Sequence, residues 1–205
     1  MTPAAEPGTT TPAEEQARQA PVPGVRALAV PAHPDDRGVF RTTFDRAVLE
    51  EDLGQPVFPV AQVSHSVSRR GVVRGVHYAR RAPGVAKVVH CAAGAVLDIV
   101  VDLRVGSPSL GQWDAYRLTA EGPALYLPPG VGHAFVALQD DTVVSYLLSR
   151  RYDPGDELVV SVFDPELGLS LPDLPLVLSD RDRAAPGLRA ALAEGLLPLA
   201  EQMCG

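Results

Sequence analysis

The sequence predicts an all-β fold, either a β-barrel or a β-sandwich. From Val25 onward, short apolar or alternating runs recur, and Gly, Pro and Asp residues separate them. Few segments have helical periodicity, and the chain has no long-period repeat. Many short strands with glycine turns and few helices are typical of barrels and sandwiches.

Ten segments have the strand pattern, and two more have helical features. The expected strands are residues 26–31, 38–44, 60–68, 72–78, 86–92, 96–103, 113–118, 124–127, 134–138 and 143–148. Residues 45–53 should form a short helix capped by Asp45, since a side-chain oxygen there can accept from the first free N–H groups. Residues 185–197 should form a second helix, because four leucines fall on one face: Leu188, Leu192, Leu196 and Leu197.

The domain organisation follows from length and composition. A chain of 205 residues can bury one good core. Residues 1–23 are rich in Ala, Pro, Thr and Glu without apolar periodicity, so they are expected to be a disordered tail. Residues 24–205 are expected to be one domain.

Charge and hydropathy limit the partners and the location. The net charge is −7, and no Lys/Arg block stands out, so neither nucleic acid nor a membrane surface is an expected partner. An anionic small ligand remains possible, because a few local arginines can hold a phosphate. The N-terminus lacks a secretory signal, and Cys91 and Cys204 make no framework, which favours a cytoplasmic location.

Two histidines stand where a barrel would bring them together. His77 lies in the run Arg74-Gly75-Val76-His77-Tyr78, and His133 follows a Pro-Gly turn. Inward side chains of a small barrel meet around its centre. Such a pair can hold a metal, move protons near neutral pH, or fill the core.

The metal interpretation lacks ligands. Small double-sheet barrels of the cupin type often bind a metal through HxH, a later Glu and a distant His. The distant part is present as Pro128-x-Gly130-x-x-His133, but Ala79 stands two residues after His77 and no Glu follows through Pro83. One or two histidines do not make a tight three- or four-ligand site. The sequence therefore predicts no metal.

A series of short motifs carries a family resemblance. They are Asp36-Arg37-Gly38-x-Phe40, Gln62-x-x-His65-Ser66, Gly71-Val72-Val73-Arg74-Gly75-Val76-His77-Tyr78, Lys87-Val88-Val89, Gly94-x-x-x-Asp98, Val101-Asp102-Leu103-Arg104-x-Gly106-Ser107-Pro108, Pro128-x-Gly130-x-x-His133-x-Phe135, Ser145-Tyr146, Tyr152-x-Pro154, Asp164-Pro165 and Leu178-Ser179-x-x-Asp182. In these motifs the chain resembles the dTDP-4-dehydrorhamnose 3,5-epimerase family and the epimerases of antibiotic deoxysugar pathways. The resemblance implies a cupin-type double-sheet jelly-roll β-barrel with short flanking helices, a homodimer, no cofactor, and a dTDP-linked 4-keto-6-deoxyhexose as substrate.

The resemblance also assigns catalytic roles, which the chemistry explains. Carbons 3 and 5 of such a sugar flank a ketone, so their protons are acidic through an enolate. Epimerisation needs a base on one face, a cation at the enolate oxygen and an acid on the other face. By the family pattern His77 is the base and Asp182 orients it, Lys87 stabilises the enolate oxygen, and Tyr146 is the acid.

Six further residues are expected to bind the substrate. Arg37 and Arg74 match the family's diphosphate and sugar contacts, and Gln62 matches a contact to sugar or base. The other three are His133, Tyr152 and Ser64. Ser64 stands where the rhamnose enzymes usually carry Asn, and Ala79 stands near their usual Gln. These departures favour an enzyme that acts mainly at one carbon, with C5 slightly favoured over C3.

Each assignment has a structural alternative. His77 could be a satisfied core histidine, Lys87 could extend its ammonium to solvent, and Tyr146 could be an ordinary barrel aromatic. Asp182 could belong to a solvated charge run, Asp180-Arg181-Asp182-Arg183. Two other function classes remain open: a non-catalytic sugar-nucleotide-binding cupin and a metal-dependent cupin enzyme.

Overall fold

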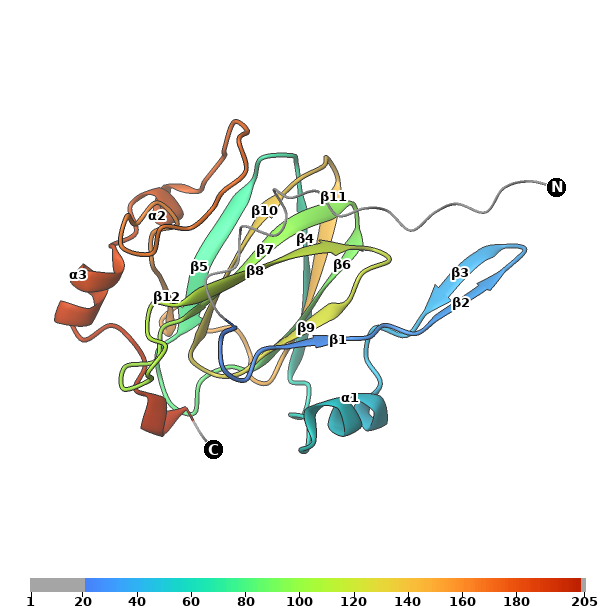
Figure 1. Cartoon of the computed structure of the whole chain (residues 1–205), viewed down its shortest axis with the longest axis horizontal. Coiled ribbons are helices and arrows are strands. Elements are labelled where there is room, and N and C mark those ends of the chain that lie inside the picture. The colour runs from blue at the N-terminus through green and yellow to red at the C-terminus, as the bar shows by residue number, and fades with distance from the viewer. Residues whose placement is uncertain (1–20, 204–205) are drawn as a thin grey trace.

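Two five-stranded antiparallel sheets form the body of the molecule (Figure 1). The computed structural model describes residues 21–203. In the first sheet the strand order is β1 (Arg26–Leu28), β9 (Ala124–Leu127), β6 (Lys87–Ala93), β11 (Thr142–Leu148) and β4 (Gln62–Ser68). In the second sheet it is β12 (Glu157–Val159), β5 (Val73–Ala79), β10 (Val131–Ala137), β7 (Ala95–Asp102) and β8 (Trp113–Thr119). The expected all-β jelly-roll architecture is confirmed.

The inner faces of the two sheets share one apolar core. Val89 and Val144 of the first sheet pack in the same cluster as Val100, Leu118 and Phe135 of the second. All five side chains are almost fully buried. Because alternate residues of each strand point inward, the interior is filled from both sides except where polar side chains replace the apolar ones.

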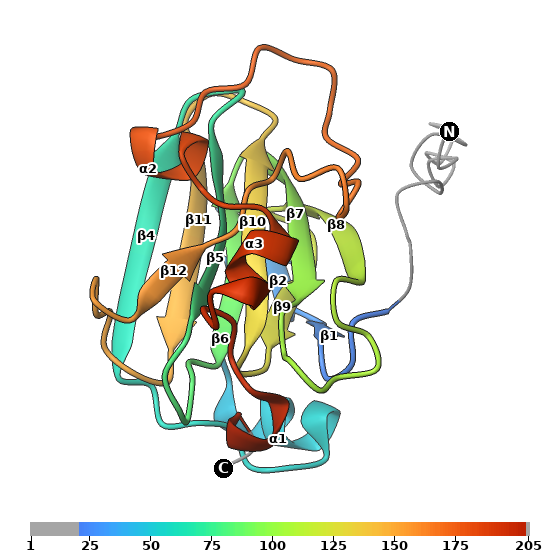
Figure 2. The same ribbon diagram turned by 90° about the vertical axis from the view of Figure 1, so that its left-hand side faces the viewer.

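The second sheet is buried on its outer face as well. Residues 160–197 pass over that face and carry α2 (Asp180–Arg183) and α3 (Leu188–Ala193) (Figure 2). Val162, Leu167 and Ala191 pack against β5, β7 and β8 in a second apolar cluster. Every residue of β10 is buried as a result. A strand covered on both faces has a continuous apolar sequence instead of an alternating one.

Two short strands, β2 (Ala32–Asp35) and β12, were not predicted from the sequence. One continuous strand was expected over residues 26–31, but β1 ends at Leu28, and β2 then pairs with β3 (Gly38–Arg41) in a projecting hairpin (Figure 1). All of β2 is exposed and it contains Pro34, so it has no apolar alternation. Strand β12 has only three residues, too few for a period to be recognised.

The helices agree with expectation in part. Helix α1 (Arg46–Leu53) begins where expected, and the Asp45 side chain accepts hydrogen bonds from the N–H groups of Ala47 and Val48. The second expected helix, residues 185–197, is wrong in extent, because α3 spans only Leu188–Ala193 and Gly195 follows with a positive φ of 62°. Leu192 points outward and is 42% exposed, whereas Leu197 is buried beyond the helix.

The N-terminal limit of the domain lies earlier than residue 24. Val22 is 2% exposed in the inner core, and the Pro23 carbonyl accepts a hydrogen bond from Arg104. The boundary predicted after residue 23 is therefore too late, since the chain is already packed at Val22. The remainder of the expected tail, residues 1–20, lies outside the described residues, as do residues 204 and 205. Among residues 21–203, no helix has the length and apolar content needed to cross a bilayer.

Candidate active site

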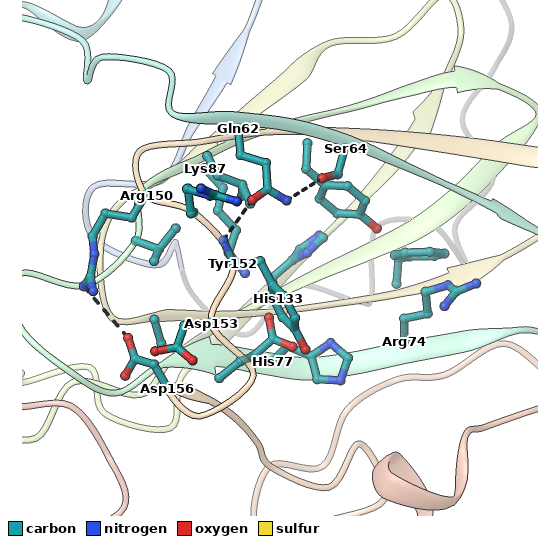
Figure 3. A pocket seen from close by; sticks show the side chains of 17 residues that line it. Gln62, Ser64, Arg74, His77, Lys87, His133, Arg150, Tyr152, Asp153 and Asp156 are labelled. Atoms are coloured by element: carbon teal, nitrogen blue, oxygen red, sulfur yellow. Dashed lines mark hydrogen bonds and ion pairs between the residues drawn. The ribbon is translucent and has the colours of Figure 1, made fainter.

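A cavity of about 310 Å³ opens between the two sheets on the side of β4, β5 and β12 (Figure 3). Eight of the predicted site residues line it: Gln62, Ser64, Arg74, His77, Lys87, His133, Tyr146 and Tyr152. These residues come from five strands and one loop. The cavity therefore unites residues that the sequence separates by as many as 90 positions.

A β-bulge in β5 turns both Arg74 and His77 toward the cavity. His133 of β10 pairs with His77, but Phe135 pairs with Arg74, so two residues of β5 stand opposite one of β10. Without the extra residue, side chains three positions apart would point to opposite faces. Gly75 has a φ of 114°, and a Cβ there would lie 2.3 Å from the His133 carbonyl oxygen. Only glycine fits this bulge.

His77 and Asp182 form a close pair at the cavity wall. His77 Nε2 lies 2.6 Å from Asp182 Oδ1. The His77 side chain is 25% exposed and that of Asp182 only 4%. Burial by itself raises the pKa of Asp182, but the hydrogen bond and charge of His77 outweigh it, so the pKa lies below its ordinary value. The carboxylate is thus ionised and holds the imidazole in one orientation.

Helix α2 is held where it delivers Asp182. The Ser179 hydroxyl caps the helix by accepting from the Asp182 N–H at 3.1 Å. Arg181 donates to the Glu157 carbonyl oxygen of β12 and lies 3.6 Å from the Glu157 carboxylate. Strand β12 in turn pairs with β5, with Val159 opposite His77. The run of charges at residues 180–183 is therefore a docked helix and not a fully solvated segment.

Lys87 and His133 share a buried carboxylate neighbour, Asp98. His133 Nε2 lies 2.8 Å from Asp98 Oδ2, and Asp98 is fully buried. Burial raises the pKa of Asp98, while the charges of His133 and Lys87 oppose that rise. Burial lowers the pKa of Lys87, and the carboxylates of Glu157 and Asp98 partly offset the effect. Lys87 thus lies in a poorly solvated cavity, where the two nearby carboxylates favour its charged form.

Tyr146 faces the cavity from β11. Its hydroxyl lies 3.4 Å from the Ser66 hydroxyl, and its ring meets the His133 ring edge-on with centroids 6.0 Å apart. Burial raises the pKa of Tyr146 above its ordinary value. The phenol therefore keeps its proton throughout the neutral range, as a proton donor must.

Arg37 is the predicted site residue that the structure places elsewhere. It lies at the projecting β2–β3 hairpin with 91% of its side chain exposed, and it bonds to Asp35. It does not line the cavity of its own chain. Of the two arginines expected to contact the diphosphate and sugar, only Arg74 lines this cavity, because Arg37 is carried on a hairpin that leaves the barrel.

Several cavity residues were missed from the sequence. They are Arg150, Arg151, Asp153, Asp156 and Glu157, together with Val85, Phe135 and Leu148. The charged ones follow β11 in the segment that leads to β12, which was not recognised as a strand. The available signal was a cluster of charged residues after a strong strand, two arginines followed by three acidic residues. No group of three or more His, Cys, Asp or Glu side chains within residues 21–203 is placed to hold a metal ion.

Comparison with known proteins agrees with the geometry. The family model for dTDP-4-dehydrorhamnose 3,5-epimerase matches residues 19–190. A dTDP-4-dehydrorhamnose 3,5-epimerase from Streptomyces griseus is 49% identical over 168 residues, which cover 82% of this chain and 84% of the relative. The family model thus spans every strand of the barrel and every residue that lines the cavity.

Solved structures show the same fold. NovW, a 4-keto-6-deoxy sugar epimerase from the novobiocin gene cluster of Streptomyces spheroides, superposes with a TM-score of 0.85 at 42% identity, covering 91% of this chain and 94% of that one. ChmJ, a 3′-monoepimerase from Streptomyces bikiniensis solved with dTDP-quinovose, gives 0.85 at 41% identity, covering 90% and 94%. The family model, the relative and the cupin-type barrel of the solved structures agree, and the chain belongs to the dTDP-4-dehydrorhamnose 3,5-epimerase family.

Proposed function

We propose that this protein inverts one or both carbons beside the ketone of a dTDP-linked 4-keto-6-deoxyhexose, in a deoxysugar or antibiotic pathway. The observation that carries the proposal is the His77–Asp182 pair at the wall of a cavity that also holds Lys87 and Tyr146. A base, a cation and a proton donor around one cavity are the groups that enolate chemistry requires. A sugar-binding protein without activity would have no need of this combination.

His77 removes the proton from the sugar carbon. Its Nε2 is engaged by Asp182, so Nδ1 is the ring nitrogen that accepts the proton. The C–H electron pair moves into a carbon–carbon double bond, and the ketone oxygen becomes an oxyanion. The buried Asp182 carboxylate stabilises the imidazolium that forms.

Lys87 stabilises that oxyanion. Its ammonium lies in a cavity where burial disfavours charge, so a developing anion beside it is attracted more strongly than in water. The buried His133–Asp98 pair lines the same region and contributes to the polar environment of the ketone.

Tyr146 completes the inversion by donating its phenolic proton to the opposite face of the enolate. The product carbon has the inverted configuration, and the ketone is restored. Solvent then returns one proton to Tyr146 and removes one from His77, so no electrons are gained or lost. These proton-transfer steps need neither a metal nor a redox cofactor.

Carbon 3 is the position we propose to be inverted in every case. Of the relatives above, one is named a 3,5-epimerase and another a 3′-monoepimerase, and C3 is common to both names. The sequence departures at Ser64 and Ala79 favoured action at one carbon with a slight preference for C5, and the relatives lend that preference no support. Whether C5 is inverted as well depends on how the first product sits relative to His77.

We further propose a cytoplasmic homodimer in which the β2–β3 hairpin reaches the second subunit. Strand β4 is an edge strand, and its outward Val63 and Val67 are 67% and 57% exposed. The hairpin carries Phe40, which is 70% exposed. An apolar edge strand and an apolar hairpin are each exposed in one chain and are suited to pairing with another chain. Arg37 would then approach the cavity of the partner and bind the diphosphate there.

Product analysis tests the proposed function. The protein is incubated with dTDP-4-dehydro-6-deoxyglucose, the ketone is reduced with borohydride, and the sugars are identified by NMR. We expect products with inverted C3, alone or with inverted C5. Recovery of unchanged sugar at enzyme concentrations that convert the substrate fully for a relative would contradict the proposal.

A further inference from the structure

The segment between β11 and β12, residues 149–156, forms one wall of the cavity mouth (Figure 3). On the side of residues 79–86 it is held by several hydrogen bonds. The Ser149 N–H donates to the Ala86 carbonyl at 3.0 Å, and the Arg81 N–H donates to Asp156 at 2.7 Å. These two hydrogen bonds fix the first and the last residue of the segment against residues 79–86.

On the side of β4, the segment is held by a side chain. The Tyr152 N–H donates to Gln62 Oε1 at 3.0 Å, and Gln62 Nε2 donates to Ser64 Oγ at 2.8 Å (Figure 3). We call this pair of hydrogen bonds the Gln62 bridge. It joins the first residues of β4 to the middle of the segment, 90 positions away.

The orientation of the Gln62 carboxamide follows from its partners. A backbone N–H can only donate, so the Tyr152 N–H requires the oxygen of Gln62. The nitrogen is then directed at Ser64, whose hydroxyl can accept. Rotating the amide by half a turn would place two donors against each other at Tyr152. Both ends of Gln62 are therefore engaged by the protein, and these two hydrogen bonds fix the orientation of its carboxamide.

The Gln62 bridge holds the backbone of Tyr152, whose side chain lies at the cavity. Its ring is 49% exposed and lines both the main cavity and an adjoining one of about 320 Å³. Arg74, His77 and Glu157 line the same two cavities. Tyr152 thus stands where the two spaces meet, beside the proposed base, and its place is set by the backbone that Gln62 holds.

We propose that Gln62 is a positioning residue: by bridging Ser64 and the Tyr152 N–H, it fixes the segment 149–156 over the cavity and sets the place of Tyr152 against the bound nucleotide sugar. This deepens the proposed function and depends on it only for the identity of the ligand. The expectation that Gln62 also contacts sugar or base stays a prediction, since the amide retains one N–H and one lone pair beyond the bridge.

Amide hydrogen exchange tests the bridge directly. The full-length wild type is compared with Gln62→Leu, Gln62→Glu and Gln55→Leu, with and without dTDP. Gln55 is exposed after α1 and serves as the matched control. In Gln62→Leu the Tyr152 amide should exchange roughly three- to tenfold faster, the change expected for one ordinary hydrogen bond. Gln62→Glu should restore protection, because a carboxylate oxygen accepts from Tyr152 and the Ser64 hydroxyl can donate to the other.

Ligand binding and kinetics separate positioning from other roles. In Gln62→Leu, the dissociation constant of dTDP and the KM for the sugar nucleotide should rise by roughly three- to tenfold, more than kcat falls. Gln55→Leu should match the wild type in every measurement. Unchanged Tyr152 exchange in Gln62→Leu would overturn the proposal, as would exchange in Gln62→Glu as fast as in Gln62→Leu. A wild type that fails to epimerise would refute the proposed function, while the exchange data would still decide the bridge.

Discussion

Asp182 and His77 stand 105 positions apart in the chain, yet their side chains meet at 2.6 Å. The contact depends on a helix of four residues that a serine cap and an arginine hold against β12. Asp182 is 4% exposed, so its charge is poorly screened by water and acts strongly on the imidazole.

Replacing Asp182 by Asn should reduce kcat/KM by about 10²–10⁴-fold, the range that general base catalysis contributes. The amide removes the anion that stabilises the imidazolium. Its N–H can also donate to Nε2, which leaves the proton on Nδ1, where the base must accept one. Steady-state kinetics with the dTDP-sugar measure the loss, and unchanged dTDP affinity shows that the cavity is intact. Activity near that of the wild type would mean that Asp182 does not orient the base.

Replacing Tyr146 by Phe should separate proton removal from inversion. The change deletes only the hydroxyl, and His77 acts from the other face, so substrate hydrogen should still exchange with solvent deuterium. Configuration should be largely retained. NMR of the recovered sugar reports both quantities, and Ser66→Ala serves as a control for the neighbouring hydroxyl. Inversion at the wild-type rate would show that another group or water is the acid.

Lys87 should set the alkaline limit of activity. Burial lowers its pKa, so as pH rises the ammonium loses its charge earlier than an ordinary lysine would, and kcat/KM should fall there. The raised pKa of Tyr146 keeps that phenol protonated in the same range. Lys87→Arg should have a lower rate at neutral pH but no such alkaline decline, because guanidinium stays charged. An identical decline in the variant would exclude Lys87 as its cause.

Arg37 should act across a subunit interface. Arg37→Ala should raise KM about tenfold or more, as loss of a charge-assisted hydrogen bond does. When Arg37→Ala and His77→Asn chains are unfolded together and refolded, half of the dimers are mixed, and each has one intact site, giving about a quarter of wild-type activity.

The matched control for this mixture pairs Tyr146→Phe with His77→Asn. Both of these residues line the cavity of one chain, so neither site of a mixed dimer is intact and no activity should return. Recovery with the Arg37 pair but not with the Tyr146 pair supports a shared site. Equal outcomes in the two mixtures would contradict it.

The strands and the cavity residues were largely predictable from the sequence, for a physical reason. Long strands such as β4 and β11 alternate in burial, and that alternation is visible in the residues themselves. The motif around His77 predicted it as the base, and the order of motifs predicted Lys87, Tyr146 and Asp182 as its partners in the site. The barrel fold brings these four side chains together around one cavity, which the sequence pattern alone does not show.

Other features depend on tertiary contacts that no local pattern reveals. The β5 bulge at Gly75 is defined by a carbonyl of β10, and the short β12 exists only because β5 pairs with it. The Gln62 bridge joins residues 90 positions apart, so no local pattern indicated it. Arg37 was expected at the diphosphate but sits on a hairpin whose direction the sequence does not encode locally.

Deuterium uptake by the substrate tests the role of the His77–Asp182 pair most directly. Wild type and His77→Asn are incubated with dTDP-4-dehydro-6-deoxyglucose in deuterated water, and NMR follows the hydrogens at C3 and C5. His65→Asn, a change of an exposed histidine on β4, is the control. The wild type and the control should take up deuterium at C3, with or without C5, and His77→Asn should be slower by about 10²–10⁴-fold while still binding dTDP. Uptake at the wild-type rate in folded His77→Asn would contradict the assignment of His77 as the base.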